Sequence, residues 1–126
     1  MTSASNARET AALAKTAAAI CLDRKANDVV ILDLDSVSDM TDFFVIASGT
    51  SDTHVRSIAQ HVMEEMKKRG LSAHHVEGLN QGRWVLIDFV DLVIHVFHPT
   101  LRTFYQLERL WGDAAVVQVA PQGAVT

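Results

Sequence analysis

The sequence predicts an α/β fold in which a mixed parallel and antiparallel sheet is flanked by helices. Residues 29–32 and 43–47 are continuous apolar runs, as in strands buried on both faces. Between residues 55 and 66, apolar residues recur with the period of a helix. The apolar segments 84–89 and 92–97 are separated by so short a turn that they should form an antiparallel hairpin.

The first half of the chain alternates helical and extended patterns. Residues 6–25 are alanine-rich with a modest apolar stripe, which favours a helix that ends at residues 27–28. The following strand, residues 29–35, becomes alternating at its end and should be half-exposed there. A turn at residues 48–52 leads into the amphipathic helix, which Gly70 ends.

The second half predicts a short extended segment at residues 74–77 and then the hairpin. The strand after the amphipathic helix can return parallel to the strand before it, which would make the sheet mixed. Pro99 permits a final helix over residues 100–111. We therefore expect a single domain over residues 1–113 and a flexible tail over residues 114–126.

Composition and charge exclude several classes of protein. The chain has 126 residues, 48% of them hydrophobic, which suits a packed core, and no apolar run approaches the ~20 residues that span a bilayer. Residues 28–99 hold 11 acidic and 5 basic side chains, so direct binding to bare nucleic acid is not expected. The single cysteine excludes an intrachain disulfide. With no secretory pattern at the amino terminus, the cytoplasm is the expected location.

A glycine-containing turn is the first candidate for chemistry. Gly49-Thr50-Ser51 lies at a strand-to-helix junction, where free backbone amides attract phosphate. It lacks the lysine of a phosphate-binding loop and the third glycine of a dinucleotide fingerprint. Capping of the helix by Ser51 or Asp52 is therefore the favoured interpretation.

Two pairs of carboxylates are the second candidate. Asp33 with Asp35, and Asp88 with Asp91, could hold Mg²⁺ for phosphoryl transfer. The first pair sits at a strand end and the second brackets a turn, where Asp commonly bonds backbone amides. A structural role is favoured for both pairs.

The six histidines lack the spacing of metal ligands. His74 and His75 would point to opposite faces of an extended segment, and His54 and His61 are seven residues apart instead of four. His95 lies inside a strand. The single cysteine sits in the small-residue stripe of the first helix, away from any histidine in sequence. We expect no catalytic metal, no catalytic thiol and no cofactor.

The expected last helix carries more large apolar residues than one stripe can hold. Tyr105 and Leu107 project beyond the stripe that contains Leu101 and Phe104, and arginine and glutamate interleave with them. Such a composition is typical of a protein-binding hot spot. A helix that packs on two sides against its own domain would explain this composition equally well. Trp84, at the start of a strand, presents the same two alternatives.

Six blocks of residues occur along the chain in an order that is specific to one family. They are Leu32-Asp33-Leu34, Thr41-Asp42-Phe43-Phe44-Val45-Ile46-Ala47-Ser48-Gly49-Thr50-Ser51, Glu77-Gly78, Trp84-Val85-Leu86-Ile87-Asp88, Val93-Ile94-His95-Val96-Phe97 and Arg102-Thr103-Phe104-Tyr105-Gln106-Leu107-Glu108-Arg109-Leu110-Trp111. Over about residues 8–113 the chain resembles the Iojap-like ribosomal silencing factor family. It departs from the pattern at Phe89-Val90, where the family often has an aromatic residue or Leu followed by Gly.

The resemblance implies a nucleotidyltransferase-like domain that has lost its acidic metal site and is not an enzyme. It implies binding to the large ribosomal subunit through large-subunit ribosomal protein fourteen, with little direct contact to nucleic acid and none to membranes. Bound there, such a protein sterically blocks joining with the small subunit and represses translation when nutrients are scarce. A homodimer off the ribosome is compatible with the resemblance.

The resemblance also implies which residues meet the partner. Trp84, Tyr105 and Leu107 are the main expected contacts. Weaker ones are expected at Asp88, Asp91, His95, Arg102 and Glu108.

Two other classes of function stay open on the residues alone. A nucleotidyltransferase-like enzyme would use Gly49, Ser51, Mg²⁺ and a nucleoside triphosphate, but it needs paired carboxylates on a strand facing the glycine turn. The pair at Asp33 and Asp35 precedes that turn in the sequence instead of following it. A plain dimerisation module is the other alternative.

Overall fold

A mixed sheet forms the centre of the structure, a computed structural model that describes residues 3–34, 41–101 and 115–117. Within these residues the strands are β1 (Asn27–Asp33), β2 (Phe43–Ser48), β3 (His75–Glu77), β4 (Trp84–Asp88), β5 (Leu92–Phe97) and β6 (Ala115–Val117). Their order across the sheet is β3-β4-β5-β2-β1-β6. Strands β2 and β5 pair in parallel, and the other pairs are antiparallel. The predicted α/β class with a mixed sheet is confirmed.

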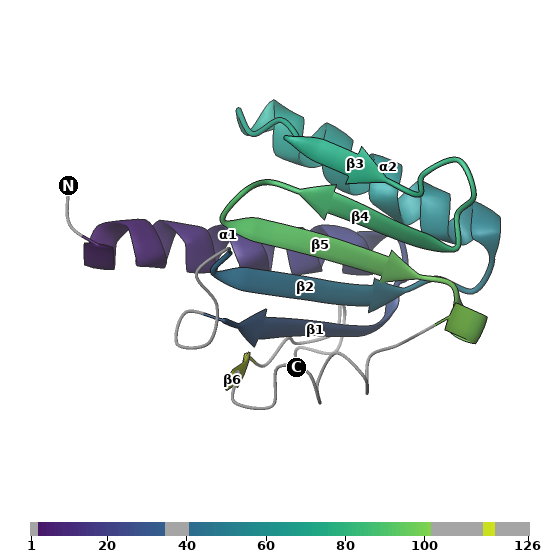
Figure 1. The fold of residues 1–126 in the computed structure, drawn as a ribbon, viewed down its shortest axis with the longest axis horizontal. Helices are drawn as coiled ribbons and strands as arrows, with labels where there is room; N and C mark the ends of the chain where they lie inside the picture. The colour runs from purple at the N-terminus through teal and green to yellow at the C-terminus, as the bar shows by residue number, and fades with distance from the viewer. Residues whose placement is uncertain (1–2, 35–40, 102–114, 118–126) are drawn as a thin grey trace.

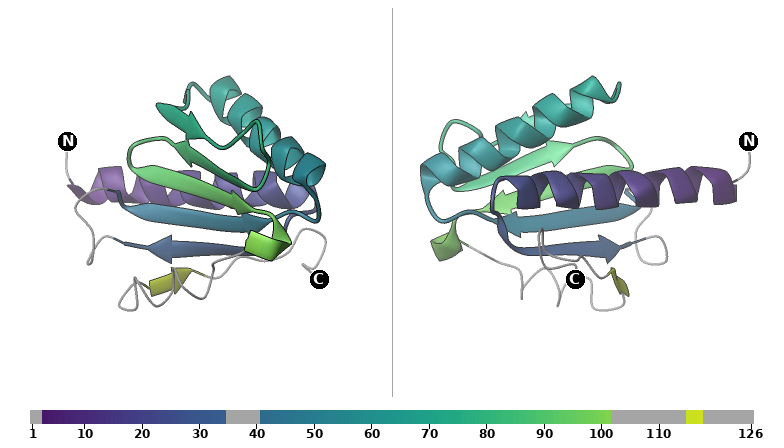
Figure 2. Two further views of the ribbon diagram at one scale, coloured as in Figure 1. Left: turned by 45° about the vertical axis from the view of Figure 1, so that its right-hand side comes forward. Right: turned by 180° about the vertical axis from the view of Figure 1, so that it is seen from behind.

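Two helices, α1 (Ser3–Asp23) and α2 (Asp52–Lys68), cover one face of this sheet. Both lie behind the strands in Figure 1 and in front of them when the molecule is seen from the back in Figure 2. The main core lies between the helices and this face, and α1 supplies small side chains to it, among them Ala14, Ala17 and Cys21. A short 3₁₀ helix, η1 (Pro99–Leu101), follows β5. Neither α1 nor α2 has the length and hydrophobicity of a membrane-spanning helix.

The boundaries of α2 follow from local chemistry. Ser51 has an extended backbone (φ −157°, ψ 169°), and its hydroxyl accepts a hydrogen bond from the amide of His54 at 3.1 Å, as an N-cap residue does. Gly70, just beyond the C-cap, adopts the left-handed conformation (φ +84°) that ends many helices. The buried residues of the helix repeat with helical spacing: Val55, Ile58, Ala59, Val62 and Met66. The predicted amphipathic helix is confirmed.

The pairing of the strands differs from the simplest reading of the sequence. The strand that pairs in parallel with β2 is β5 and not β3. Although β3 directly follows α2, it lies at the edge of the sheet, and β4 and β5 stand between it and β2. Strands β4 and β5 form the predicted antiparallel hairpin, with Trp84 opposite Phe97 and Asp88 opposite Val93. The first helix ends at Asp23, four residues before β1 begins.

The sheet extends further toward the carboxyl terminus than the sequence indicated. Ala115–Val117 pairs with β1 as strand β6, with Val116 opposite Leu32. We expected residues 114–126 to be a flexible tail, so this strand was not predicted. The other residues of that segment lie outside the described ranges. The part of the expected helix over residues 100–111 that follows Leu101 also lies outside the described ranges.

Candidate protein-binding face of the sheet

The face of the sheet turned away from α1 and α2, called here the distal face, holds three of the four described residues that the sequence singled out for partner binding. Because register partners in a sheet share a face, the pairing places its side chains in rows across β4, β5, β2 and β1. The rows comprise Trp84, Phe97 and Ser48; Leu86, His95, Ile46 and Val30; and Asp88, Val93, Phe44 and Leu32.

Four rings gather on the distal face, and we refer to Phe44, Trp84, His95 and Phe97 as the aromatic cluster. The ring of Trp84 lies 5.0 Å from that of Phe97, between centroids, at a tilt of 32°. The ring of Phe44 meets that of His95 edge to face at 4.7 Å, and His95 stacks with Phe97 at 6.1 Å. These separations suit favourable aromatic pairs. Phe97 and His95 are buried, Phe44 is half-buried, and Trp84 is 44% exposed.

A hydrogen bond joins the exposed ring to a buried one. The indole Nε1–H of Trp84 donates to Nδ1 of His95 at 3.1 Å. Burial lowers the pKa of His95 from 6.5 to about 4, so its imidazole is neutral at physiological pH. The other ring nitrogen, Nε2, is buried and has no hydrogen-bond partner in the part of the chain that the structure describes.

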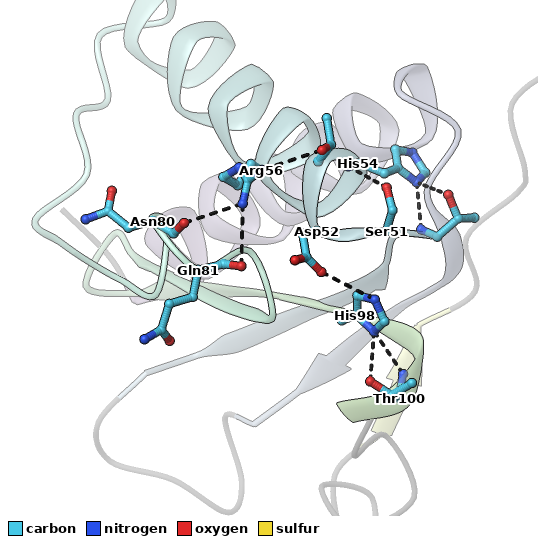
Figure 3. Close-up of polar contacts among 10 residues, drawn as sticks. Ser51, Asp52, His54, Arg56, Asn80, Gln81, His98 and Thr100 are labelled. Carbon is cyan, nitrogen blue, oxygen red and sulfur yellow. Dashed lines mark hydrogen bonds and ion pairs between the residues drawn. The ribbon is translucent and has the colours of Figure 1, made fainter.

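The loop before Trp84 is held against the first turn of α2 (Figure 3). The guanidinium of Arg56 lies 3.4 Å and 3.5 Å from the carbonyl oxygens of Asn80 and Gln81. At the end of β5, the amide of His98 donates to the carbonyl of Arg83 at 2.7 Å, and His98 Nε2 lies 3.5 Å from the Asp52 carboxylate. The backbone that leads into Trp84 is therefore held by α2 on one side and by the end of β5 on the other.

Close packing reinforces this loop. A Cβ added to Gly82, which has φ +67°, would stand 2.6 Å from the carbonyl oxygen of Asp52. Only glycine combines this left-handed backbone with so close an approach to the helix.

Asp88 and Asp91 stand at the opposite end of β4 from Trp84, around the hairpin turn. The Asp88 carboxylate accepts a hydrogen bond from the amide of Val90 at 2.7 Å, as expected for an Asp beside a turn. The carbonyl of Asp91 accepts from the amides of Asp42 and Phe43 at 3.0 Å and 3.2 Å. Val90 itself has φ +78°, the left-handed region, in the position where the resemblance leads one to expect glycine.

Three of the eight sequence-predicted contacts thus share the distal face: Trp84 and His95 are in contact, and Asp88 lies at the other end of β4. Asp91 follows in the exposed turn beyond Asp88. The remaining four, Tyr105, Leu107, Arg102 and Glu108, lie outside the described residues.

The turn at Gly49-Thr50-Ser51 uses its amides within the protein. The amide of Gly49 donates to the carbonyl of Phe97 at 2.9 Å, and the amide of Thr50 donates to Nδ1 of His54 at 2.8 Å. Because Nδ1 accepts, His54 Nε2 carries a proton, which it donates to the carbonyl of Arg24 at 2.6 Å. His54 therefore fastens the end of α1 to the start of α2. These contacts favour the capping interpretation over a phosphate site.

The carboxylate pairs that the sequence singled out do not converge on one site in the described part of the chain. Asp33 follows Ile31 on the helix-covered side of β1, whereas Asp88 faces the distal side; Asp35 lies outside the described residues. No group of three or more metal-binding side chains occurs among the residues described. Burial raises the pKa of the Cys21 thiol to about 12, so this thiol is not an activated nucleophile.

Sequence reasoning did not single out Phe44 and Phe97 as parts of the site, or the bond between Trp84 and His95. A signal for them existed in the predicted hairpin. A two-residue turn at Val90 and Asp91 sets Phe89 opposite Leu92 and Asp88 opposite Val93. The alternation of side chains then puts Trp84 on the same face as His95 and Phe97. Phe44 could not be found in this way, because its neighbour on β5 is set by a parallel pairing across 49 residues.

The protein is a mixed α/β domain that carries an aromatic cluster on one sheet face, with Trp84 exposed from it, and comparison with known proteins identifies the family. Residues 6–125 match the family described as ribosomal silencing factor during starvation. The chain is 41% identical over 105 residues to the ribosomal silencing factor RsfS of Bacillus subtilis, covering 83% of this chain and 89% of that protein. The chain belongs to the ribosomal silencing factor family.

Two more similarities extend this result. A crystal structure of a Bacillus halodurans protein superposes with a TM-score of 0.74 at 38% identity, covering 89% of this chain and 99% of that one. A mouse protein named mitochondrial assembly of ribosomal large subunit protein 1 is 33% identical over 104 residues, which cover 77% of this chain and 46% of the mouse protein. The resemblance inferred from the sequence blocks is confirmed.

Proposed function

We propose that the protein represses translation by binding the large ribosomal subunit through large-subunit ribosomal protein fourteen, where it sterically prevents joining of the small subunit. The match to the silencing factor family over residues 6–125 carries this proposal. The names of relatives support its two halves, since one refers to silencing and another to the ribosomal large subunit. Its place of action would be the cytoplasm, and it would need no cofactor and no catalytic step.

The charge of the domain supports contact with a protein patch. Residues 28–99 hold 11 acids and 5 bases, a net charge of −6 from these side chains. An acidic surface is repelled by the phosphates of ribosomal RNA and attracted by basic protein surfaces. Ribosomal RNA would thereby confine docking to an exposed protein on the subunit surface.

The distal face supplies a candidate anchor for this contact. Trp84 is 44% exposed and sits on buried rings, and a large aromatic side chain on a rigid base is the type of residue that dominates binding energy. Tyr105 and Leu107 are proposed to complete the anchor. Asp88, Asp91, Arg102 and Glu108 would contribute contacts around it, and the buried His95 would support it from beneath.

The test is cosedimentation of the protein with purified large subunits, together with a light-scattering assay of subunit joining. Trp84→Ala should weaken binding by about 1–3 kcal/mol and weaken inhibition of joining in parallel. Val90→Ala is the matched control, because Val90 is 53% exposed but lies in the turn at the other end of β4. Circular dichroism should show both variants folded.

Four outcomes contradict the proposal or a part of it. The wild-type protein could fail to sediment with the large subunit, or could sediment without slowing subunit joining. A folded Trp84→Ala variant with wild-type affinity would show that the anchor lies elsewhere. Transfer of nucleotides with Mg²⁺ above background, lost in Asp33→Ala, would favour the enzyme alternative.

A further inference from the structure

The hydrogen bond between Trp84 and His95 joins an exposed side chain to a buried one. The proposed silencing function does not by itself require this hydrogen bond. Trp84 is 44% exposed, whereas His95 is 4% exposed on the same face of the sheet. The indole N–H reaches Nδ1 of the imidazole at 3.1 Å across neighbouring strands. A half-exposed indole could satisfy this N–H with water, so the bond is not required to avoid a buried unpaired donor.

The chemistry of the two rings fixes the protonation of His95. An indole N–H can only donate, so Nδ1 must hold a free lone pair. The proton of the neutral ring then sits on Nε2, which is buried without a partner among the described residues. A second proton on Nδ1 would remove the acceptor and break the bond.

The surroundings of His95 disfavour that second proton. In its own row stand Ile46 and Leu86, and in the adjacent rows Phe97, Phe44 and Val93. The nearest ionisable side chains on this face, among the residues described, are Asp88, diagonal to His95 on β4, and Glu77, which pairs with Leu86 from β3. Glu77 already binds His75 at 2.8 Å, and the Asp88 carboxylate accepts from the amide of Val90.

We propose that His95 is a positioning residue, whose neutral imidazole fixes the indole of Trp84 in the orientation that a docking protein meets. This inference rests on the proposed function, because the docking protein would be the one on the large ribosomal subunit. His95 itself is too buried to meet that partner directly. The ring of Phe97, tilted by 32° from the indole, packs against it, and the hydrogen bond sets the rotation of the indole about its remaining side-chain angle.

A fixed indole lowers the entropic cost of docking. A side chain that must be immobilised on binding costs affinity, and an anchor held in its bound orientation avoids that cost. Releasing the indole should therefore weaken binding about 3- to 10-fold. The loss should be smaller than that of removing the indole altogether.

Paired substitutions at His95 test the proposal. In His95→Asn the amide oxygen can accept a hydrogen bond close to the position of Nδ1, whereas His95→Leu fills the space without an acceptor. Two readouts are used: the indole ¹H–¹⁵N signal of Trp84 in the free protein, assigned by its disappearance in Trp84→Phe, and affinity for purified large subunits. The first readout does not depend on the ribosome.

The expected result is a graded one. In His95→Leu the indole proton signal moves upfield and affinity falls about 3- to 10-fold, while His95→Asn keeps the signal position and binds within about 2-fold of wild type. In the Trp84→Phe background, His95→Leu should bring no further loss, because the bond is already absent. If His95→Leu fails to fold, His95→Gln replaces it, since the longer amide cannot accept at the Nδ1 position.

Two results would overturn the inference. One is a folded His95→Leu or His95→Gln variant with a displaced indole signal and wild-type affinity. The other is a loss of affinity in His95→Asn as large as in the variants without the acceptor. If the wild-type protein does not bind the large subunit while the indole signals behave as expected, the proposed function is wrong but the hydrogen bond between Trp84 and His95 is confirmed.

Discussion

Acidification should destabilise the protein through His95, and the size of the effect follows from the burial of its ring. Burial lowers the pKa of this imidazole from 6.5 in the unfolded chain to about 4 in the folded one. Between these values the unfolded state binds the proton and the folded state does not. Stability is therefore complete above pH 6.5 and is lost as the pH falls toward 4.

The magnitude can be worked from the two pKa values. Each unit of difference corresponds to about 1.4 kcal/mol, so His95 should lower the free energy of unfolding by about 2 kcal/mol between pH 7 and pH 5. By pH 4 the loss should reach about 3 kcal/mol and then level off. Protonation of His95 in the folded protein also breaks the bond from Trp84, so the indole signal should change near pH 4, below the range in which most of the stability is lost.

Urea denaturation between pH 7 and pH 4, for the wild type and for His95→Asn, measures this effect. The other titrating groups are common to both proteins, so the difference between the two pH profiles isolates His95. The wild type should lose stability relative to the variant by the amounts given above. Parallel profiles, within about 0.5 kcal/mol, would show that His95 titrates near its ordinary pKa and that burial does not hold it neutral.

Two further predictions concern the backbone. Val90→Gly should stabilise the protein by about 0.5–1 kcal/mol, because the left-handed backbone costs a β-branched residue more than glycine loses in chain entropy. Little buried area is lost, since Val90 is 53% exposed. A variant whose thermal unfolding midpoint equals or falls below that of the wild type would refute this. Gly78→Ala should destabilise the protein by more than Gly70→Ala, since both have left-handed backbones but only the first would bring a Cβ into overlap with the carbonyl oxygen of Trp84. Equal melting temperatures for the two variants would contradict that difference.

Local patterns in the sequence predicted the longer elements and the hairpin of β4 and β5, but not how the other strands pair. The apolar period of α2 and the runs of β1, β2 and β5 encode their own conformations, because burial on one or both faces leaves a periodic trace. The parallel pairing of β2 with β5 leaves no such trace. Strand β6 was missed because three residues, Ala-Val-Val, are too short for a periodic signal.

The candidate site shows the same division. Trp84 could be selected from its sequence context and from the family resemblance, and it does lie half-exposed on the distal face. The hydrogen bond from its indole to His95 was missed, although the hairpin offered a signal for it, since a histidine between apolar neighbours in a strand looks like an ordinary core residue. Only the register of the hairpin brings His95 beside it.

The pairing of β6 with β1 has a consequence for the order in which the chain can fold during synthesis. Strand β1 lies between β2, which follows it closely, and β6, which is made more than 80 residues later. Until Ala115–Val117 emerges, the outer side of β1 around Ile31 and Leu32 is an exposed edge with unpaired amides and carbonyls. Such edges attract other extended chains, so the nascent protein is most prone to aggregation late in its translation. A chain truncated before residue 115 would keep this edge permanently.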